Sequence, residues 1–146
     1  MTRLFLDSNV VVYGLDPRAP KKQDRCLAWL SLAAEKNSLA ISPQVCAETK
    51  SVAERKLRIR PAEVRTIVLQ LLPWCTAPQT GEEIRRALDL ADRWRMSWWD
   101  SLILASAIGA ECTHLVTEDA QSAPVIEGVR LIDPFLVAPQ DILGAA

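Results

Sequence analysis

Two aspartates follow apolar runs that are typical of short buried β-strands. Asp7 comes directly after the run at residues 4–6, and Asp119 lies just beyond a second predicted strand at residues 114–117. In open parallel sheets, ligands bind outside the carboxyl ends of the strands. The two side chains are therefore expected at one edge of a sheet. The alternatives are that Asp7 only starts a turn or caps a helix, and that Asp119 is an ordinary loop residue.

Two further carboxylates lie near the predicted starts of helices. Ser42 and Pro43 mark the start of a helix that carries Glu48, and Ser97 with Asp100 has the capping spacing Ser-x-x-Asp. The helix after Ser97 is apolar around most of its circumference, which predicts burial on several sides. Asp100 is thus expected in a partly enclosed place. A helix cap alone remains an alternative for Asp100, and a solvated position beside lysines remains one for Glu48.

Carboxylates that converge on one sheet edge repel one another, and some hold protons unless a cation offsets the charge. Mg²⁺ and Mn²⁺ prefer carboxylate oxygen and water as ligands. Such a site can polarise a phosphoryl oxygen and lower the pKa of a bound water, which is the chemistry that phosphodiester hydrolysis needs. The predicted ligands are Asp7, Glu48, Asp100 and Asp119.

The rest of the apolar pattern supplies the elements that must position these groups. The predicted order is a strand at 4–6, a helix at 21–37, a strand at 39–42, helices at 43–57, 61–72, 82–94 and 97–108, a strand at 114–117, a loop at 118–124 and a strand at 129–133. This alternation predicts an α/β fold, a three-layer α/β/α sandwich with a mostly parallel central sheet. We expect a single domain at residues 1–135 and a loose C-terminal tail at 136–146.

Composition narrows the classes of partner. The formal net charge of −1 predicts no general affinity for polyanions, so RNA would have to meet a local basic patch. No apolar run is long enough to cross a membrane, and four scattered cysteines suit a reducing cytoplasm. The candidate RNA-binding residues, which a solvated basic face explains equally well, are Lys50, Arg55, Lys56 and Arg58.

The order of these motifs resembles that of PIN-domain ribonucleases of the VapC-type toxin group. The resemblance extends over residues 4–135 and is carried by LFLDSNVVVYGLD, SPQVCAET, SWWDSLILASAIGAECTHLVTEDAQ and GVRLIDPF. It implies the PIN fold, cleavage of RNA with Mg²⁺ or Mn²⁺, a homodimer, and a small antitoxin that blocks the site. Thr49 departs from the family pattern, because relatives often have a bulky apolar residue after the glutamate.

The resemblance also assigns roles to individual residues. It implies that the four predicted ligands form the catalytic, metal-binding pocket. It implies supporting polar roles near that pocket for Asn9 and Thr117, and for Ser8.

Two other classes of protein fit parts of the pattern. A non-catalytic PIN-fold module would keep the acidic edge and bind RNA or protein, and a failure to bind Mn²⁺ would favour it. A phosphoacceptor domain of the receiver kind needs a lysine after a late strand, but no lysine follows Lys56. Trp98 and Trp99 flank Asp100 and suit either base stacking or packing in a core or dimer interface.

Overall fold

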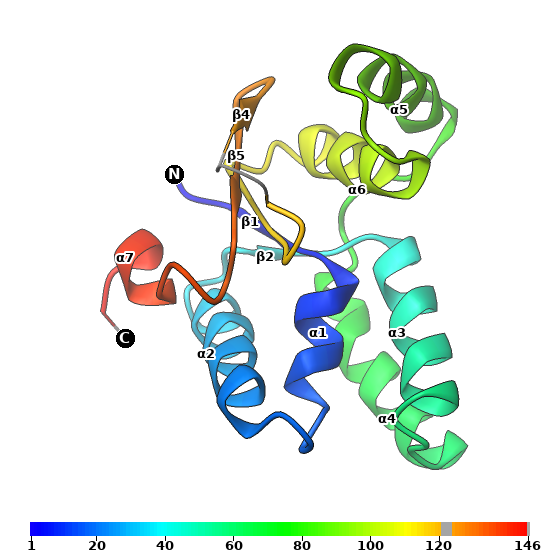
Figure 1. Cartoon of the computed structure of the whole chain (residues 1–146), viewed down its shortest axis with the longest axis vertical. Coiled ribbons are helices and arrows are strands. Elements are labelled where there is room, and N and C mark those ends of the chain that lie inside the picture. The colour runs from blue at the N-terminus through cyan, green and yellow to red at the C-terminus, as the bar shows by residue number, and fades with distance from the viewer. Residues whose placement is uncertain (121–123, 146) are drawn as a thin grey trace.

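The computed structural model describes residues 1–120 and 124–145 (Figure 1). Its single sheet has the strand order β2-β1-β3-β5-β4, with parallel pairing throughout except between β4 and β5. The predicted three-layer α/β/α sandwich with a mostly parallel sheet is confirmed. The strands are β1 (Leu4–Leu6), β2 (Leu39–Ala40), β3 (His114–Val116), β4 (Val125–Ile126) and β5 (Val129–Ile132).

Seven α-helices and one 3₁₀ turn accompany the sheet in the described residues. Helix α1 packs against both α2 and α3, whereas α5 and α6 form a separate pair (Figure 1). The helices are α1 (Ser8–Gly14), α2 (Pro20–Glu35), α3 (Pro43–Arg55), α4 (Pro61–Leu71), the 3₁₀ turn η1 (Leu72–Trp74), α5 (Gly81–Trp94), α6 (Trp98–Gly109) and α7 (Pro139–Leu143).

The helix starts agree with the capping residues in the sequence. The Ser42 hydroxyl accepts a hydrogen bond from the backbone N–H of Val45, the third residue of α3. Glu83 accepts from the backbone N–H of Thr80 at 2.7 Å, which completes a capping box at the start of α5. The Ser97 hydroxyl accepts from the N–H of Asp100 at 3.2 Å. Local hydrogen bonds therefore set where three of the long helices begin.

The sheet register places the first and third strands side by side. Leu4, Phe5 and Leu6 are fully buried, and Leu6 is level with Val116 on β3. The residue after β1 is therefore next to the residue after β3. The apolar core thus fixes the relative positions of Asp7 and Thr117.

Some predictions were incomplete or wrong. The short strand β4 and the helix α7 were not predicted, and the predicted loop at 118–124 lies partly outside the described residues. A loose tail is wrong for residues 139–143, because they form α7, and Ile142 and Leu143 pack against the core. Arg25 on α2 also donates a 3.0 Å hydrogen bond to the Val137 carbonyl. None of the described helices has the length and apolar character needed to cross a membrane.

Candidate metal centre

Asp7 lies at the junction of β1 and α1 and is only 6% exposed. Its Oδ1 accepts a 2.7 Å hydrogen bond from the backbone N–H of Ser8, so the side chain caps α1. Its Oδ2 accepts a 2.8 Å hydrogen bond from the hydroxyl of Thr117. The cap predicted as an alternative role is therefore real, but it occupies one carboxylate oxygen and leaves the other facing β3.

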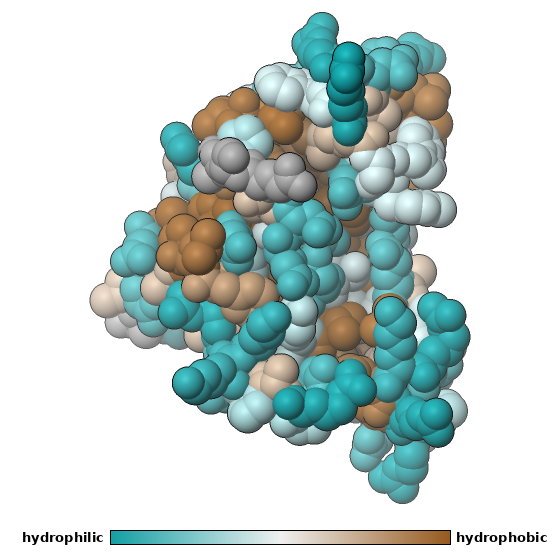
Figure 2. All heavy atoms as spheres, viewed as in Figure 1, coloured by the Kyte–Doolittle hydropathy of each residue, from teal (hydrophilic) through white to brown (hydrophobic). Residues whose placement is uncertain are grey.

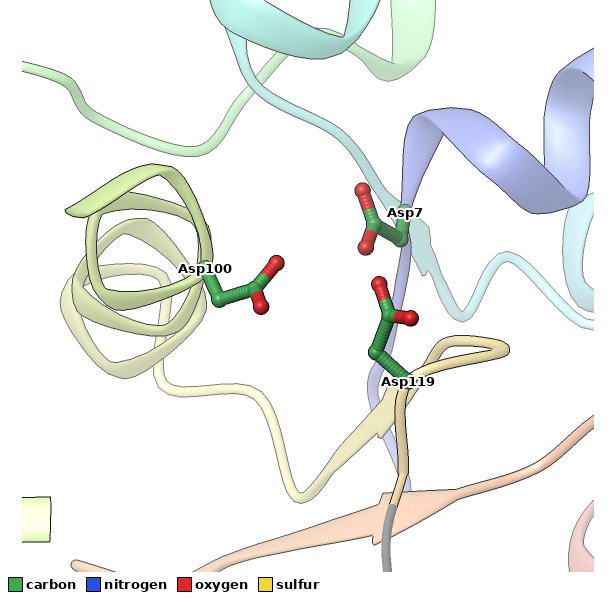
Figure 3. Close-up of side chains that lie close together, drawn as sticks. All are labelled: Asp7, Asp100 and Asp119. Carbon is green, nitrogen blue, oxygen red and sulfur yellow. The ribbon is translucent and has the colours of Figure 1, made fainter. Parts of the chain in front are cut away.

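Asp100 is in the first turn of α6, opposite Asp7. Every residue of α6 from 101 to 107 is buried, so the helix is held on several sides as predicted from its apolar sequence. The backbone N–H of Asp100 is bonded to Ser97, whereas its carboxylate points toward Asp7 and Asp119 (Figure 3). In this structure the capping atom of α6 is the Ser97 hydroxyl, and the Asp100 carboxylate is left for the site.

Asp119 comes from the loop that follows β3. Its backbone N–H donates a 3.2 Å hydrogen bond to the Thr117 hydroxyl, which ties the loop back to the strand end. Burial raises the pKa of Asp119, and the negative charges of Asp100 and Glu118 raise it further. The Asp119 carboxylate therefore lies close enough to Asp100 to be repelled by its charge.

The three aspartates form one cluster (Figure 3). Each offers a carboxylate oxygen that lies within 4.8 Å of those of the other two. Burial raises the pKa of Asp7 to about 6, and the charges of Glu48 and Asp100 add to the rise. Hydrogen bonds from Thr117 and Ser8 oppose it, because they stabilise the charged form. The cluster thus carries an unbalanced negative charge that a bound cation would offset.

The predicted supporting residues lie around this cluster. Asn9 donates hydrogen bonds of 3.5 Å to Asp7 Oδ2 and 3.3 Å to the Thr117 hydroxyl. Its side-chain oxygen accepts from the backbone N–H of Glu118 at 3.3 Å. Ser8 contributes its N–H and, at 3.5 Å, its hydroxyl to Asp7 Oδ1. The network therefore fixes both oxygens of the most buried aspartate.

Glu48 is not brought into the group of ligand-spaced carboxylates. Among the described residues that group consists of the three aspartates alone. The Glu48 side chain instead accepts a 2.8 Å hydrogen bond from Gln44, one turn earlier on α3. It is still close enough for its charge to raise the pKa of Asp7. The sequence placed Glu48 on the correct side of the fold but did not indicate its rotamer.

The donor set fits a hard divalent cation. Mg²⁺ takes six oxygen ligands at roughly 2.0–2.1 Å, so two opposite ligands are roughly 4 Å apart, close to the spacing of the aspartate oxygens. A cavity of about 30 Å³ lies between the three aspartates, Met96 and Thr117, which is room for about two water-sized occupants. Carboxylates in that number, with water completing the shell, are the arrangement that Mg²⁺ and Mn²⁺ favour.

The PIN-domain family model matches residues 4–125. The chain belongs to the PIN-domain family. PIN domains are generally nucleases, and the acidic cluster lies within the matched residues. The sequence has no significant match among curated proteins.

Two solved structures have a fold similar to that of this PIN domain. A toxin–antitoxin complex from Klebsiella pneumoniae contains a chain with a TM-score of 0.62 and 20% identity, and the match covers 91% of this chain and 98% of that one. VapBC2 from Rickettsia felis, bound to a DNA fragment from their promoter, gives a TM-score of 0.63 and 21% identity, covering 90% and 98%. At such identities the likeness shows the fold.

The predicted RNA-binding residues lie where α3 ends. Figure 2 shows hydrophilic side chains gathered over this part of the PIN domain. Lys50 pairs with Glu54 at 3.0 Å, and Arg55 bonds to Ser51. Lys56 lines a groove of about 270 Å³ that also reaches Ser8 and Asn9, whereas the exposed Arg58 does not line it. Of the four, only Lys56 thus shares a groove with Ser8 and Asn9, which hydrogen-bond to Asp7.

Two residues beside the cluster were not among the site residues predicted from the sequence. Trp94 and Arg95 line a second groove that shares Asp100 and Asp119 with the metal cavity. The sequence contains one usable signal, because helix α5 must end before Ser97 begins the next helix. The few residues left between the two helices predict a tight connection. Which side chains of this connection face the site depends on how α5 packs on α6.

Proposed function

We propose that this PIN domain is a Mg²⁺- or Mn²⁺-dependent endoribonuclease that hydrolyses RNA phosphodiester bonds. The observation that carries the proposal is the cluster of Asp7, Asp100 and Asp119, whose oxygens lie within 4.8 Å of one another. Asp7 and Asp119 follow the carboxyl ends of the parallel strands β1 and β3, and Asp100 comes from the first turn of α6. Membership of a family of nucleases supports the reaction class. RNA as the substrate rests on the resemblance to VapC-type ribonucleases.

The three aspartates would hold the cation. When bound there, it would polarise a phosphoryl oxygen of the substrate and lower the pKa of a bound water. The fixed orientation of Asp7, held by Ser8 and Thr117, would keep a ligand oxygen in place without rearrangement. The apolar walls of the cavity, Met96 among them, would limit access of bulk water.

Glu48 would act from outside the cation's direct ligands. Its carboxylate is anchored to Gln44 and affects Asp7 through space. A carboxylate in that position can orient water or accept a proton from it. We therefore propose a proton-transfer or water-positioning role for Glu48 in place of the direct ligand role predicted from the sequence.

We further propose that the chain is the toxin of a toxin–antitoxin pair and is neutralised by a small antitoxin. The support is the similarity of fold to chains of two toxin–antitoxin complexes, over about nine-tenths of this chain. A homodimer is implied by the resemblance to VapC-type toxins, and a cytoplasmic location by the four scattered cysteines. Both stay predictions.

The test is cleavage of a defined panel of single-stranded and hairpin RNAs with Mg²⁺, with Mn²⁺ and with a chelator. The wild type should cut only with metal, and Asp100→Asn should lose cutting together with Mn²⁺ binding. Asp89→Asn, which changes an exposed carboxylate of α5, is the matched control and should cut normally. Cutting by Asp100→Asn at the wild-type rate would refute the site. If no Mn²⁺ binds near neutral pH, the non-catalytic binding module is the better explanation.

A further inference from the structure

A groove of about 320 Å³ adjoins the metal cavity on the side of α5 and α6. The groove and the cavity share Met96, Asp100, Asp119 and Leu131, so they are continuous. We call it the tryptophan groove, defined by the lining residues Trp94, Arg95, Met96, Ser97, Ile126 and Leu131. Its volume is at the lower end of the roughly 300–1,000 Å³ found for ligand sites, which suits one nucleotide better than a duplex.

The groove has an aromatic wall. Trp94 ends helix α5 and is 44% exposed, so a large part of its surface is not used in packing. Trp99 is more exposed, at 63%, but it does not line the groove. An accessible indole beside a catalytic cavity can stack a nucleobase, because every base has a π-face.

The groove also carries a cation that the protein does not use. Arg86 and Arg93 on α5 lie within 3.6 Å and 3.9 Å of Glu127, whereas among the described residues Arg95 forms no ion pair. Its guanidinium is available for an external anion.

The backbone at Arg95 decides which substitution can test its side chain without adding strain. Arg95 follows the last turn of α5 with φ 54° and ψ 39°, a left-handed conformation that glycine or asparagine normally adopts at helix ends. An L-residue with a Cβ adopts it at a cost of about 1 kcal/mol. Arg95→Gly therefore removes the side chain without adding backbone strain.

We propose that the tryptophan groove binds the nucleotide next to the scissile phosphate of a single-stranded RNA. The base stacks on Trp94, and Arg95 binds a backbone phosphate. This assignment rests on the proposed function, which puts the scissile phosphate at the three aspartates. A phosphate beside three carboxylates needs a compensating charge close by, and Arg95 is the cationic residue that lines the adjoining groove. In this arrangement Trp94 and Arg95 are substrate-binding residues and take no part in bond cleavage.

The experiment measures RNA binding separately from cleavage. Fluorescein-labelled single-stranded RNA octamers are titrated with protein in the Asp100→Asn background, and fluorescence anisotropy gives Kd over a range of salt concentrations. The groove variants are Trp94→Ala, Trp94→Phe and Arg95→Gly. The matched controls outside the groove are Trp99→Ala and Arg85→Gln, which change an exposed tryptophan and an exposed arginine of the same two helices.

Trp94→Ala should raise Kd by roughly 5- to 150-fold, the range measured for base–aromatic stacking, and Trp94→Phe should restore most of the binding. Arg95→Gly should also raise Kd and should reduce the slope of log Kd against log salt by about 0.7, the value for one phosphate contact with a single strand. Because glycine tolerates the left-handed backbone, Arg95→Gly should unfold at the same temperature as its parent or higher. A residue with only a structural role would not give weaker RNA binding in a protein of equal stability.

Unchanged Kd and salt slope in Trp94→Ala and Arg95→Gly would overturn the proposal. It would equally be overturned if the two control variants weakened binding as much, or if the octamers did not bind. The proposed function fails separately. If the groove variants bind RNA less well but the wild type cuts no RNA with Mn²⁺, the groove binds RNA as proposed, but the nuclease assignment fails, and with it the position next to a scissile phosphate. If both groove variants cut RNA at the wild-type rate and bind it with unchanged Kd, the nuclease assignment stands and the groove assignment fails.

Discussion

The hydroxyl of Thr117 donates a 2.8 Å hydrogen bond to Asp7 Oδ2 and accepts a 3.2 Å hydrogen bond from the backbone N–H of Asp119. A single side chain therefore links two of the three clustered aspartates. The link depends on the sheet, because the register that aligns Leu6 with Val116 puts the next residues of β1 and β3 beside each other. The most buried ligand is thus positioned by two core strands.

Replacing Thr117 with valine should damage the site while leaving the fold intact. Valine keeps the shape of threonine, but it removes a donor to Asp7 and an acceptor for the Asp119 N–H. Groups that orient metal ligands typically change affinity or activity by roughly 10- to 100-fold when they are lost. We expect a loss of that size in Mn²⁺ affinity, measured by calorimetry, and in RNA cleavage. Thr117→Ser keeps the hydroxyl and should restore most of both, and equal losses in the serine and valine variants would contradict this account.

Asp7→Asn should make the metal-free protein more stable at alkaline pH. The pKa of Asp7 is raised from 3.8 to about 6, so the folded state binds the proton more tightly than the unfolded state does. The folded protein is therefore penalised fully above pH 6, by up to about 3 kcal/mol, and the penalty disappears as pH falls below 3.8. Asparagine does not ionise, although it loses part of the hydrogen bonding. We expect a gain of about 1–3 kcal/mol in the free energy of unfolding at pH 8, falling to about a third of that at pH 4.5.

Urea unfolding in the presence of a chelator measures this difference. Asp92→Asn removes an exposed carboxylate from α5 and should change the free energy of unfolding little at either pH. With Mn²⁺ present the wild type should have the higher free energy of unfolding, since the cation stabilises the wild type and not Asp7→Asn. A gain that is the same at pH 8 and pH 4.5 would show that the charge of Asp7 is not its cause.

Much of the fold could be predicted because its signals are local. Ser42, Ser97 and the Thr80–Glu83 box each mark a helix start through hydrogen bonds within four residues. The fully buried run of β1 could be recognised from composition alone. Three of the four predicted carboxylates met because parallel strands place their carboxyl ends together, which is a rule of topology and needs no side-chain detail.

The parts that could not be predicted depend on tertiary packing. Strand β4 has two residues, too few for any periodic pattern, and exists because it pairs with β5. Glu48 faces Gln44 through a choice of rotamer that spacing along a helix does not determine. Trp94 carries no motif, and its place beside the metal cavity follows from how α5 packs on α6.

Glu48→Gln should separate cleavage from metal binding. Because the Glu48 carboxylate lies outside the ligand-spaced cluster, its loss should change Mn²⁺ affinity by less than about threefold. Loss of a proton-transfer group lowers the rate by roughly 10²- to 10⁴-fold, so the cleavage rate at saturating metal should fall at least 10²-fold. Glu54→Gln, on the same helix and paired with Lys50, is the matched control and should change neither the Mn²⁺ affinity nor the cleavage rate. If Glu48→Gln abolished Mn²⁺ binding as Asp100→Asn is expected to do, Glu48 would be a direct ligand after all.

Thr49→Val should stabilise the protein without changing the site. Thr49 is fully buried on α3, and among the described residues its hydroxyl has no hydrogen-bond partner. Valine has nearly the same shape and leaves no polar group without a partner, so the free energy of unfolding should rise by about 1 kcal/mol. Thr66→Val is the control, because that exposed hydroxyl donates to the Ala62 carbonyl at 3.2 Å and its loss should cost no more than about 0.5 kcal/mol. Urea unfolding measures both changes, and a less stable Thr49→Val protein would mean that the hydroxyl is hydrogen-bonded in solution.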